Sequence, residues 1–283
     1  PAVIGAKRST MSLGGKPPEP DPDNAGGGIL SIGFAFCLSH IIRCGIFYFE
    51  EAIFMTSSFK TKRLVESALM IALSAILSFI ILFRLPFGGS ITACCMLPVI
   101  LVSYRYGVKW GFVTAFAFSL IQGIQGIAEG TFSAAALGVE NGVFNGGFFS
   151  GSPLLAALGI FLLDYIIAFT VLGIGGIFRD KIKNKPLALV CGILLAGLLR
   201  YVAHVISGAI FFGIWGEWFF TQEGFFAWGQ TLVDMFPGKT LYVLYSLIYN
   251  LFFLLPEVGL TALAGFLIAK AMPKLLQSQQ ADR

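Results

Sequence analysis

The sequence has few charged residues. Lys, Arg, Asp and Glu make up 12% of its 283 residues, whereas ordinary soluble domains carry about 25%. Hydrophobic residues reach 57%, and the mean hydropathy is +0.84. This composition excludes a disordered regulator, a disulfide-rich secreted scaffold and most nucleic-acid binders. Because most of the basic residues lie in short loops, we expect no nucleic-acid partner.

Residues suited to metal binding or catalysis are also scarce. The chain has two histidines and five cysteines, and the spacing of the cysteines does not match a metal site. No serine has a usable His and Asp arrangement, and the HExxH motif is absent. Gly238-Lys239-Thr240 resembles the end of a phosphate-binding loop, but Val233 occupies the position that requires a glycine. We therefore predict no metal, no cofactor and no enzymatic activity, including no ATPase site.

Long apolar runs predict an all-α membrane protein. A helix needs about 20 apolar residues to cross a lipid bilayer. The second of the expected helices is short for a perpendicular crossing, and Pro256 should kink the last. The six expected transmembrane helices cover about 64–83, 91–106, 110–128, 153–178, 187–213 and 241–271.

The basic residues are distributed unequally between the two sides of these helices. One side holds twelve of them, and the opposite side holds only Arg84 and Lys239. Since cytoplasmic loops carry the excess of Lys and Arg, the twelve-residue side should be cytoplasmic, and both termini with it. The twelve are Lys60, Lys62, Arg63, Arg105, Lys109, Arg179, Lys181, Lys183, Lys185, Lys270, Lys274 and Arg283.

Several polar side chains interrupt the apolar runs. An ionisable group at mid-membrane costs about 2.5–3.5 kcal/mol, so each one needs a reason. Asp164 and Tyr165 lie in the fourth helix, and Arg200 and His204 lie four residues apart on one face of the fifth. The same stripes continue through Gly208, Phe212 and Trp215, and the sixth helix adds Tyr242, Tyr245, Tyr249, Asn250 and Glu257.

These polar groups have two interpretations. One is a set of interhelical hydrogen bonds and ion pairs, for instance between Asp164 and Arg200, each contributing about 0.6 kcal/mol. The other is a common site for one small polar ligand, which we favour for the group as a whole.

Two other features are open to more than one interpretation. The outer loops 129–152 and 214–240 are rich in Phe, Trp and Gly, which is typical of an interfacial aromatic belt and equally of a cover over an outward-facing pocket. Ala68 and Ala72 form a small-residue face on the first helix. Such a face suits internal packing or the docking of an external helix.

The residues from 60 to 276 resemble the thiamine-specific substrate-binding (S) component of energy-coupling factor (ECF) transporters. Each motif is weak alone, but their order along the predicted helices is specific. The motifs are Gly88-Gly89-Ser90-Ile91-Thr92, Met96-Leu97-Pro98, Ser103-Tyr104-Arg105-Tyr106-Gly107-Val108-Lys109-Trp110-Gly111, Leu163-Asp164-Tyr165-Ile166-Ile167-Ala168-Phe169, Leu172-Gly173-Ile174-Gly175-Gly176-Ile177-Phe178, Arg200-Tyr201-Val202-Ala203-His204, Ser207-Gly208, Tyr245-Ser246-Leu247-Ile248-Tyr249-Asn250 and Leu255-Pro256-Glu257.

The resemblance implies a six-helix fold in the cell membrane that binds thiamine near the outer surface. It also implies a separate coupling module, made of a transmembrane subunit and two ATPase subunits, that docks on Ala68 and Ala72. The ligand residues that it implies are Asp164, Tyr165, Arg200, His204, Gly208, Tyr245 and Asn250, with Phe212 or Trp215 as the stacking aromatic.

Two alternatives to this assignment remain. An S component of the same fold could bind another vitamin or precursor, such as hydroxymethylpyrimidine or riboflavin. A stand-alone secondary transporter would need coupling-ion sites, for which Asp164 and Glu257 are the candidates.

The first 54 residues differ in character from the rest. Glu50-Glu51-Ala52 can be encoded as GAGGAGGC, a ribosome-binding sequence, a few codons before Met55. Residues 20–28 can be back-translated to resemble the 3′ part of the thiamine pyrophosphate riboswitch. We therefore expect 1–54 to be a translated upstream leader and 55–283 to be the membrane-embedded binding domain. The alternative is a disordered tail followed by an extra span or an uncleaved signal.

Overall fold

Helices dominate the part of the chain that the structure describes. This computed structural model describes residues 59–85, 89–129, 153–222 and 226–277. The chain divides into two units, Pro1–Ser57 and Ser58–Arg283, and everything below concerns the second. The predicted leader 1–54 and most of the outer loop 129–152 lie outside the described residues.

The described elements include regular α-helices and several irregular helical turns. Segments η3 and η5 are π-helices, and η4, η6 and η7 are 3₁₀-helices. In chain order the elements are α2 (Phe59–Phe79), β1 (Ile81–Arg84), β2 (Ser90–Thr92), α3 (Met96–Tyr106), α4 (Val108–Ala128), α6 (Pro153–Ile160), η3 (Phe161–Ile167), α7 (Ala168–Thr170), η4 (Val171–Gly176), α8 (Lys185–Ser207), η5 (Gly208–Phe212), η6 (Gly213–Trp215), α9 (Gly216–Phe220), α10 (Phe226–Met235), α11 (Lys239–Ala271) and η7 (Pro273–Leu276).

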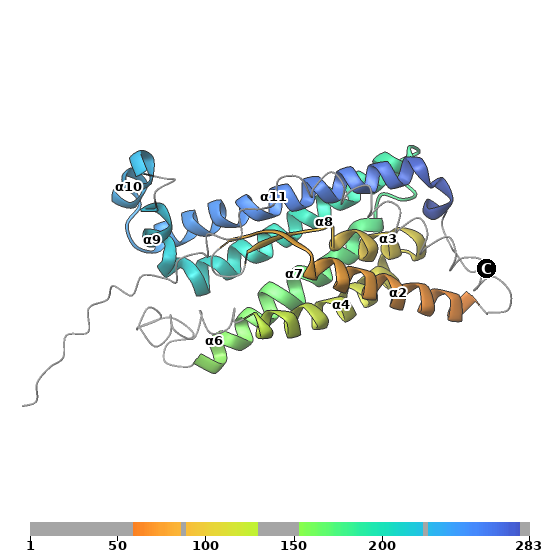
Figure 1. Ribbon diagram of the computed structural model, residues 1–283, viewed down its shortest axis with the longest axis horizontal. Helices are drawn as coiled ribbons and strands as arrows, with labels where there is room; N and C mark the ends of the chain where they lie inside the picture. The colour runs from red at the N-terminus through yellow and green to blue at the C-terminus, as the bar shows by residue number, and fades with distance from the viewer. Residues whose placement is uncertain (1–58, 86–88, 130–152, 223–225, 278–283) are drawn as a thin grey trace, which may run out of the picture. The chain divides into compact units, whose positions relative to one another are not determined.

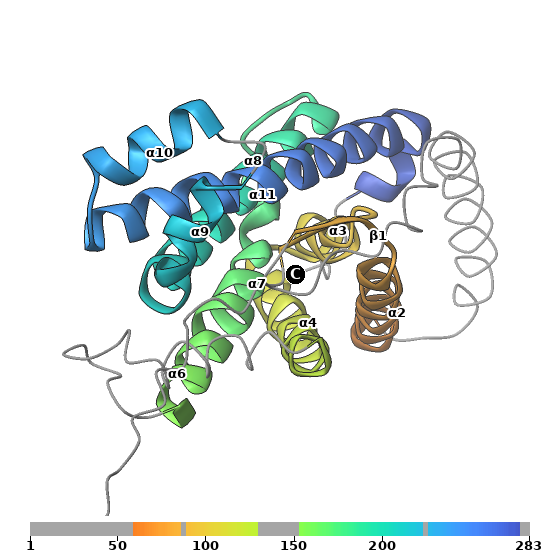
Figure 2. The ribbon, with the colours of Figure 1, turned by 60° about the vertical axis from the view of Figure 1, so that its left-hand side comes forward.

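Two groups of helices make the body of this unit. Helices α8 and α11 lie side by side along most of their length (Figure 1), and α11 also packs on η5 and α9. Helix α3 packs against α2, α4 and η4. The second view shows α3 beside α2 and α4 (Figure 2). Segment η4 contacts both groups through α3, α4 and α8. Most of the polar residues predicted on the fourth, fifth and sixth helices line one cavity, whereas Tyr242 lies against Gly213.

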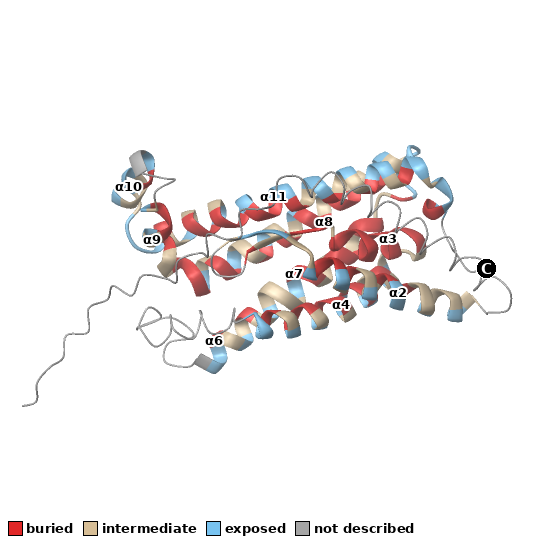
Figure 3. Cartoon of the chain, viewed as in Figure 1, coloured by how far each residue is buried: buried red, intermediate tan, exposed pale blue. Residues whose placement is uncertain are grey.

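The described residues show the surface of a protein that is solvated by lipid. Large aliphatic residues are exposed, with Leu154 at 69% and Ile124 at 67%, whereas Arg200 is 5% exposed and Glu257 is fully buried. Figure 3 shows exposed positions on the outer sides of the helices and buried positions where the helices face one another. A bilayer tolerates ionisable groups where they face the protein interior and have partners. Four described segments are long and apolar enough to cross a membrane, and they are Val108–Ala128, Leu154–Gly176, Lys185–Phe220 and Lys239–Ala271.

The first two predicted helices were placed incorrectly at their outer ends. Helix α2 ends at Phe79, and residues expected to continue it form the antiparallel strands β1 and β2, in which Ile81 pairs with Thr92 and Arg84 with Ser90. Apart from this short hairpin the described elements are helical, as the all-α assignment predicts. The two strands pair with each other, and β2 packs on α11 and α2, so that its backbone polar groups are not presented to lipid.

Helix α3 is shorter than the predicted segment 91–106 because the chain turns sharply before it. Cys94, between β2 and α3, has a φ of 61°, a conformation that a residue with a Cβ adopts at a cost. The helix then has only 11 residues, and every residue from Met96 to Arg105 is buried. A helix of that length rises about 16 Å, roughly half of the hydrocarbon thickness.

Close backbone contact between α8 and η4 generates a prediction about stability. A Cβ atom on Gly192 would overlap the carbonyl oxygen of Gly175, which is backbone and cannot rotate away. Gly192→Ala should therefore lower the free energy of unfolding by about 1–3 kcal/mol. The matched control is Gly259→Ala on α11, where a Cβ would meet no atom within 4 Å. Thermal unfolding in detergent measures both, and equal stability of the two variants would contradict the packing.

Candidate functional site

A cavity lies between the hairpin and the helices that carry the predicted polar residues. Its volume is about 100 Å³. Its lining combines polar side chains with aromatic rings, as expected of a site for a small organic solute. The lining residues are Ser78, Gly89, Ser90, Thr92, Cys95, Gln122, Gln125, Gly126, Glu129, Asp164, Tyr165, Phe169, Arg200, His204, Gly208, Phe212, Tyr245, Tyr249, Asn250, Phe253 and Glu257.

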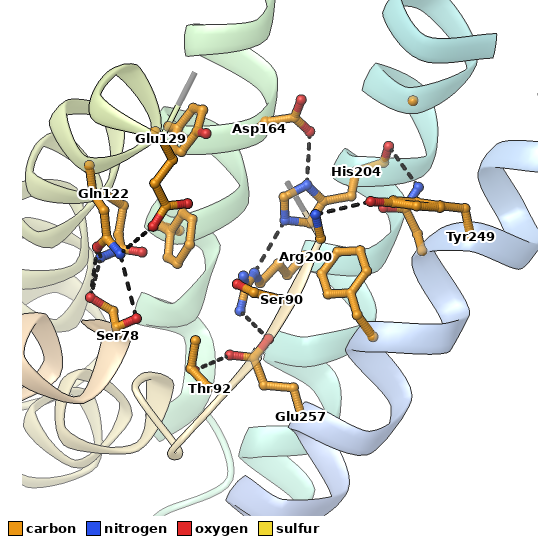
Figure 4. A pocket seen from close by; sticks show the side chains of 18 of the residues that line it. Ser78, Ser90, Thr92, Gln122, Glu129, Asp164, Arg200, His204, Tyr249 and Glu257 are labelled. Atoms are coloured by element: carbon orange, nitrogen blue, oxygen red, sulfur yellow. Dashed lines mark hydrogen bonds and ion pairs between the residues drawn. The ribbon is translucent and has the colours of Figure 1, made fainter. Parts of the chain in front are cut away.

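A continuous chain of polar side chains runs along one wall. Asp164 on η3 lies 2.8 Å from His204 Nδ1 through Oδ1, and its Oδ2 accepts a hydrogen bond of 2.6 Å from Ser207. Arg200 donates from Nε to His204 Nε2 at 3.3 Å and from Nη1 to Glu257 Oε2 at 3.2 Å (Figure 4). The chain thus joins η3, α8 and α11.

The contacts of His204 determine its tautomer. A guanidinium has no acceptor, so Nε2 of His204 must accept the hydrogen bond from Arg200. The ring proton then lies on Nδ1, where it is donated to Asp164. His204 is therefore neutral in this arrangement, and Asp164 remains an anion with unused acceptor capacity.

Glu257 anchors the other end of the chain. Its Oε1 accepts hydrogen bonds from Thr92 Oγ1 at 2.7 Å and from Cys95 Sγ at 3.5 Å. Thr92 belongs to β2 and Glu257 to α11, so this contact fixes the hairpin to the longest helix. Burial without such partners would be costly for a carboxylate.

The opposite wall is made of uncharged polar groups on α2 and α4, together with Glu129 at the end of α4. Ser78 donates to Gln125 Oε1 at 2.8 Å, and Gln122 donates to Ser78 Oγ at 3.0 Å. Gln125 also donates to Glu129 Oε1 at 3.0 Å, and Arg84 pairs with Glu129 at 3.5 Å. Figure 4 shows this group facing the Asp164 side across the cavity. The two walls offer hydrogen-bonding groups from opposite directions.

Aromatic rings from α11 line the cavity, and a ring from α9 packs against them. Tyr245 and Tyr249 lie next to each other, with ring centroids 5.4 Å apart, and Phe219 packs edge-on against both. Tyr249 accepts a hydrogen bond of 3.0 Å from the backbone N–H of Gly89. The hydroxyl of Tyr245 is buried and has no hydrogen-bond partner among the described residues. An unsatisfied buried hydroxyl at a cavity wall is a candidate ligand contact.

The π-helical turns explain how the side chains reach the cavity. Asp164 and Tyr165 lie within η3, and Gly208 and Phe212 begin and end η5. Such turns are frequent at functional sites because they change the direction of side chains relative to an α-helix. A Cβ on Gly126 of α4 would overlap the Tyr165 ring, so this glycine makes room for the ring.

Asn250 and Gly208 have more specific positions than the sequence indicated. Asn250 donates from Nδ2 to the carbonyl oxygens of Ser246 at 2.8 Å and His204 at 3.3 Å, which leaves its Oδ1 as an acceptor for a ligand. A Cβ on Gly208 would overlap Ser246 Oγ, so this glycine lets η5 approach α11 closely.

The structure brings eight of the nine predicted ligand residues to this one cavity. They are Asp164, Tyr165, Arg200, His204, Gly208, Phe212, Tyr245 and Asn250. Trp215 does not line it and instead packs on the neighbouring aromatic cluster. The direct ion pair considered between Asp164 and Arg200 is not formed: His204 lies between them, and Arg200 pairs with Glu257.

Other lining residues were not selected from the sequence. Glu257 and Tyr249 were noted among the polar residues of the sixth helix but were not included in the ligand set. The acid in an apolar helix was a signal that could have identified Glu257. Ser78, Gln122 and Gln125 gave little signal because uncharged polar side chains are common in membrane helices.

The fold and cavity together define a class of protein. Long apolar helices, lipid-facing aliphatic side chains and a polar cavity are typical of a multi-pass membrane protein that holds a small solute. The chain belongs to the thiamine transporter protein family, whose model matches residues 64–137 and 125–277. It is thus a multi-pass protein of the cell membrane, and the family indicated by the sequence motifs is confirmed.

Two known proteins are similar to this chain. The thiamine transporter ThiT of Bacillus subtilis (strain 168) is 30% identical over 238 residues, which cover 80% of this chain and 100% of that protein. The solved structure of ThiT from Listeria monocytogenes has 20% sequence identity and a TM-score of 0.51, and the match covers 78% of this chain and 100% of that one. The second likeness supports the fold.

The two neighbouring tyrosines generate a prediction. Tyr245→Phe removes a hydroxyl without a partner among the described residues, so the free energy of unfolding of the ligand-free protein should change by less than about 0.5 kcal/mol. Tyr249→Phe leaves the buried N–H of Gly89 without its acceptor and should cost about 1–3 kcal/mol. Thermal unfolding of both variants measures the difference, and equal losses would contradict these assignments.

Proposed function

We propose that this protein is the thiamine-binding subunit of an ATP-driven ECF vitamin importer. It captures thiamine from outside the cell and releases it inside, and partner subunits hydrolyse the ATP. The observation that carries the proposal is the polar chain along the cavity, which places an anionic Asp164 beside a neutral His204. Membership of the thiamine transporter family supports the choice of ligand.

The chemistry of thiamine fits the groups that line the cavity. The thiazolium ring is a permanent cation, and the carboxylate of Asp164 offsets its charge in a water-poor site. Phe212 offers an aromatic face, which adds about 0.5–2 kcal/mol to cation binding. The aminopyrimidine has both donors and acceptors, for which Tyr245 and the Oδ1 of Asn250 remain available.

We assign six membrane crossings with both termini in the cytoplasm. The basic ends of several helices meet at one end of the described unit, which supports this orientation. Arg105 pairs with Glu66 at 3.1 Å and also donates to the carbonyl oxygen of Leu275. Arg179 donates to the carbonyl oxygen of Arg105, and Lys185 donates to that of Arg179. The short α3 would complete its crossing together with the strand β2.

Ala68 and Ala72 are proposed to dock the transmembrane coupling subunit. Both lie on an exposed face of α2. Small residues four apart allow the backbone of another helix to approach closely, which is how membrane helices associate without a hydrophobic driving force.

Residues 1–54 are proposed to be an upstream leader, with Met55 as the translational start. They lie outside the described residues. The nucleotide sequence of the gene decides the matter, because the proposal requires a ribosome-binding site before Met55 and a riboswitch fold upstream of it.

The alternative of a stand-alone secondary transporter is less well supported. Its two candidate ion sites, Asp164 and Glu257, are each engaged by protein donors. The binding experiment that follows tests the other alternative, in which a protein of the same fold binds another vitamin.

Thiamine should bind the purified protein tightly without ATP. Its four tryptophans allow intrinsic fluorescence to report binding, and calorimetry gives the affinity. Asp164→Asn should weaken thiamine binding at least about tenfold, because the counter-charge to the thiazolium is lost. Asp234→Asn on α10, an exposed acid outside the cavity lining, is the control and should bind like wild type. A response to riboflavin or hydroxymethylpyrimidine and not to thiamine would overturn the assignment.

The docking face gives a separate prediction. The double variant Ala68→Trp/Ala72→Trp should keep its thiamine affinity but lose co-purification with the coupling subunit and ATPases of its host, because the bulky rings block close helix approach. Leu263→Trp, on an exposed position of α11, is the control and should co-purify normally. Retained assembly of the double variant would place the docking face elsewhere.

A further inference from the structure

The buried carboxylate of Glu257 is separated from Asp164 by two side chains, Arg200 and His204. We infer that Glu257 is a positioning residue that gives the site its preference for a cationic ligand: it cancels the charge of Arg200, so that the charge of Asp164 stays available. The inference rests on the proposed thiamine-binding function and assigns a role to a residue outside the predicted ligand set.

The contacts of Glu257 show that the protein already engages its charge. The residue has 0% exposure, and both of its oxygens accept hydrogen bonds. Oε2 accepts one from Arg200 at 3.2 Å, and Oε1 accepts two, from Thr92 at 2.7 Å and from Cys95 at 3.5 Å. Among the described residues, by contrast, the donors to Asp164 are the neutral His204 and Ser207. The negative charge of Glu257 is therefore offset by Arg200, whereas the charge of Asp164 is available to a ligand.

The charge balance of the cavity follows from these contacts. Two anions, Asp164 and Glu257, face one cation, Arg200, and His204 is neutral for the reason given above. In the part of the chain that the structure describes, the other charged lining residue is Glu129, which pairs with the half-exposed Arg84. The four linked side chains, Asp164, His204, Arg200 and Glu257, thus carry one surplus negative charge. This charge matches one positive charge on a ligand.

Removing Glu257 would change this balance without touching Asp164. Arg200, which is 5% exposed, would keep its charge after losing the carboxylate that pairs with it. The remaining linked side chains would then be neutral overall, and the guanidinium of Arg200 would repel a cationic ligand. A neutral ligand of the same shape would lose much less affinity, and this difference distinguishes an electrostatic role from a packing role.

The sequence of α11 brings the parts of this arrangement together. Asn250 and Glu257 are seven residues apart, which is two helical turns, so both buried side chains lie on the face toward α8. Arg200 and His204 are four residues apart on α8 and face the same interior. Arg200 also lies 4.3 Å from the centroid of the Phe169 ring, which limits where its guanidinium can move.

The test compares thiamine with its uncharged isostere, in which a carbon atom replaces the thiazolium nitrogen. The ratio of the two dissociation constants, measured by calorimetry on the full chain, gives the preference for the cation. Glu257→Gln should lower this preference roughly tenfold, since one charge near the ligand is removed at low effective dielectric. Arg200→Gln should raise it, and the double variant R200Q/E257Q should return it to near the wild-type value.

The control breaks a comparable ion pair elsewhere. Glu66→Gln removes the partner of Arg105, which is 3% exposed, at a site that does not line the cavity. The preference of this variant for thiamine over the uncharged isostere should equal that of wild type. If Glu257→Gln does not fold, the comparison of R200Q with R200Q/E257Q replaces it, because these two proteins also differ only in the charge at position 257.

The outcomes separate the two proposals. Equal preferences in wild type, E257Q, R200Q and the double variant would overturn the role of Glu257 while leaving thiamine binding intact. A wild-type protein that binds neither thiamine nor its isostere would overturn the proposed function instead. The expected order of preference is E257Q lowest, wild type and the double variant equal, and R200Q highest.

Discussion

The ion pair between Arg200 and Glu257 is the contact on which the rest of the site depends. It joins α8 to α11, and Thr92 ties the hairpin to the same carboxylate. A buried ion pair is weak evidence for stability, because desolvating two charges offsets most of their attraction. The ion pair instead positions other groups of the site. It holds one guanidinium nitrogen against His204, which in turn hydrogen-bonds to Asp164.

The membrane setting explains why this arrangement requires so many partners. Lipid offers no hydrogen bonds, so every enclosed polar group must find a donor or acceptor in the protein. The two walls of the cavity satisfy their own groups, through the Asp164 chain on one side and the Ser78 and Gln125 contacts on the other. The Tyr245 hydroxyl lacks a partner among the described residues, which is the type of group that a ligand would complete.

The sequence predicted most of the charged half of the site and little of its geometry. Asp164, Arg200 and His204 were predictable because ionisable groups in apolar helices are costly and therefore rare. Glu257 carried the same signal but had no assigned partner until the structure placed it against Arg200. Trp215 was projected onto the cavity by α-helical periodicity, which fails once η5 and η6 change the residues per turn.

The helix boundaries failed where irregular structure replaces a regular helix. An apolar stretch such as 64–83 has no feature that separates a helix end from a short strand, because apolarity alone does not distinguish them. The strands β1 and β2 form only because each pairs with the other, and that pairing depends on tertiary contacts with α2 and α11. Segment η3 likewise depends on Gly123 and Gly126 of α4, which leave room for its aromatic rings.

An experimental structure of the protein with bound thiamine tests most directly whether these helices hold a cation beside Asp164. The thiazolium ring should lie in the cavity next to Asp164, and the pyrimidine ring should reach Tyr245 and Asn250. Thiamine bound outside this cavity, or bound within it with the thiazolium ring remote from Asp164, would show that Asp164 is not the counter-charge.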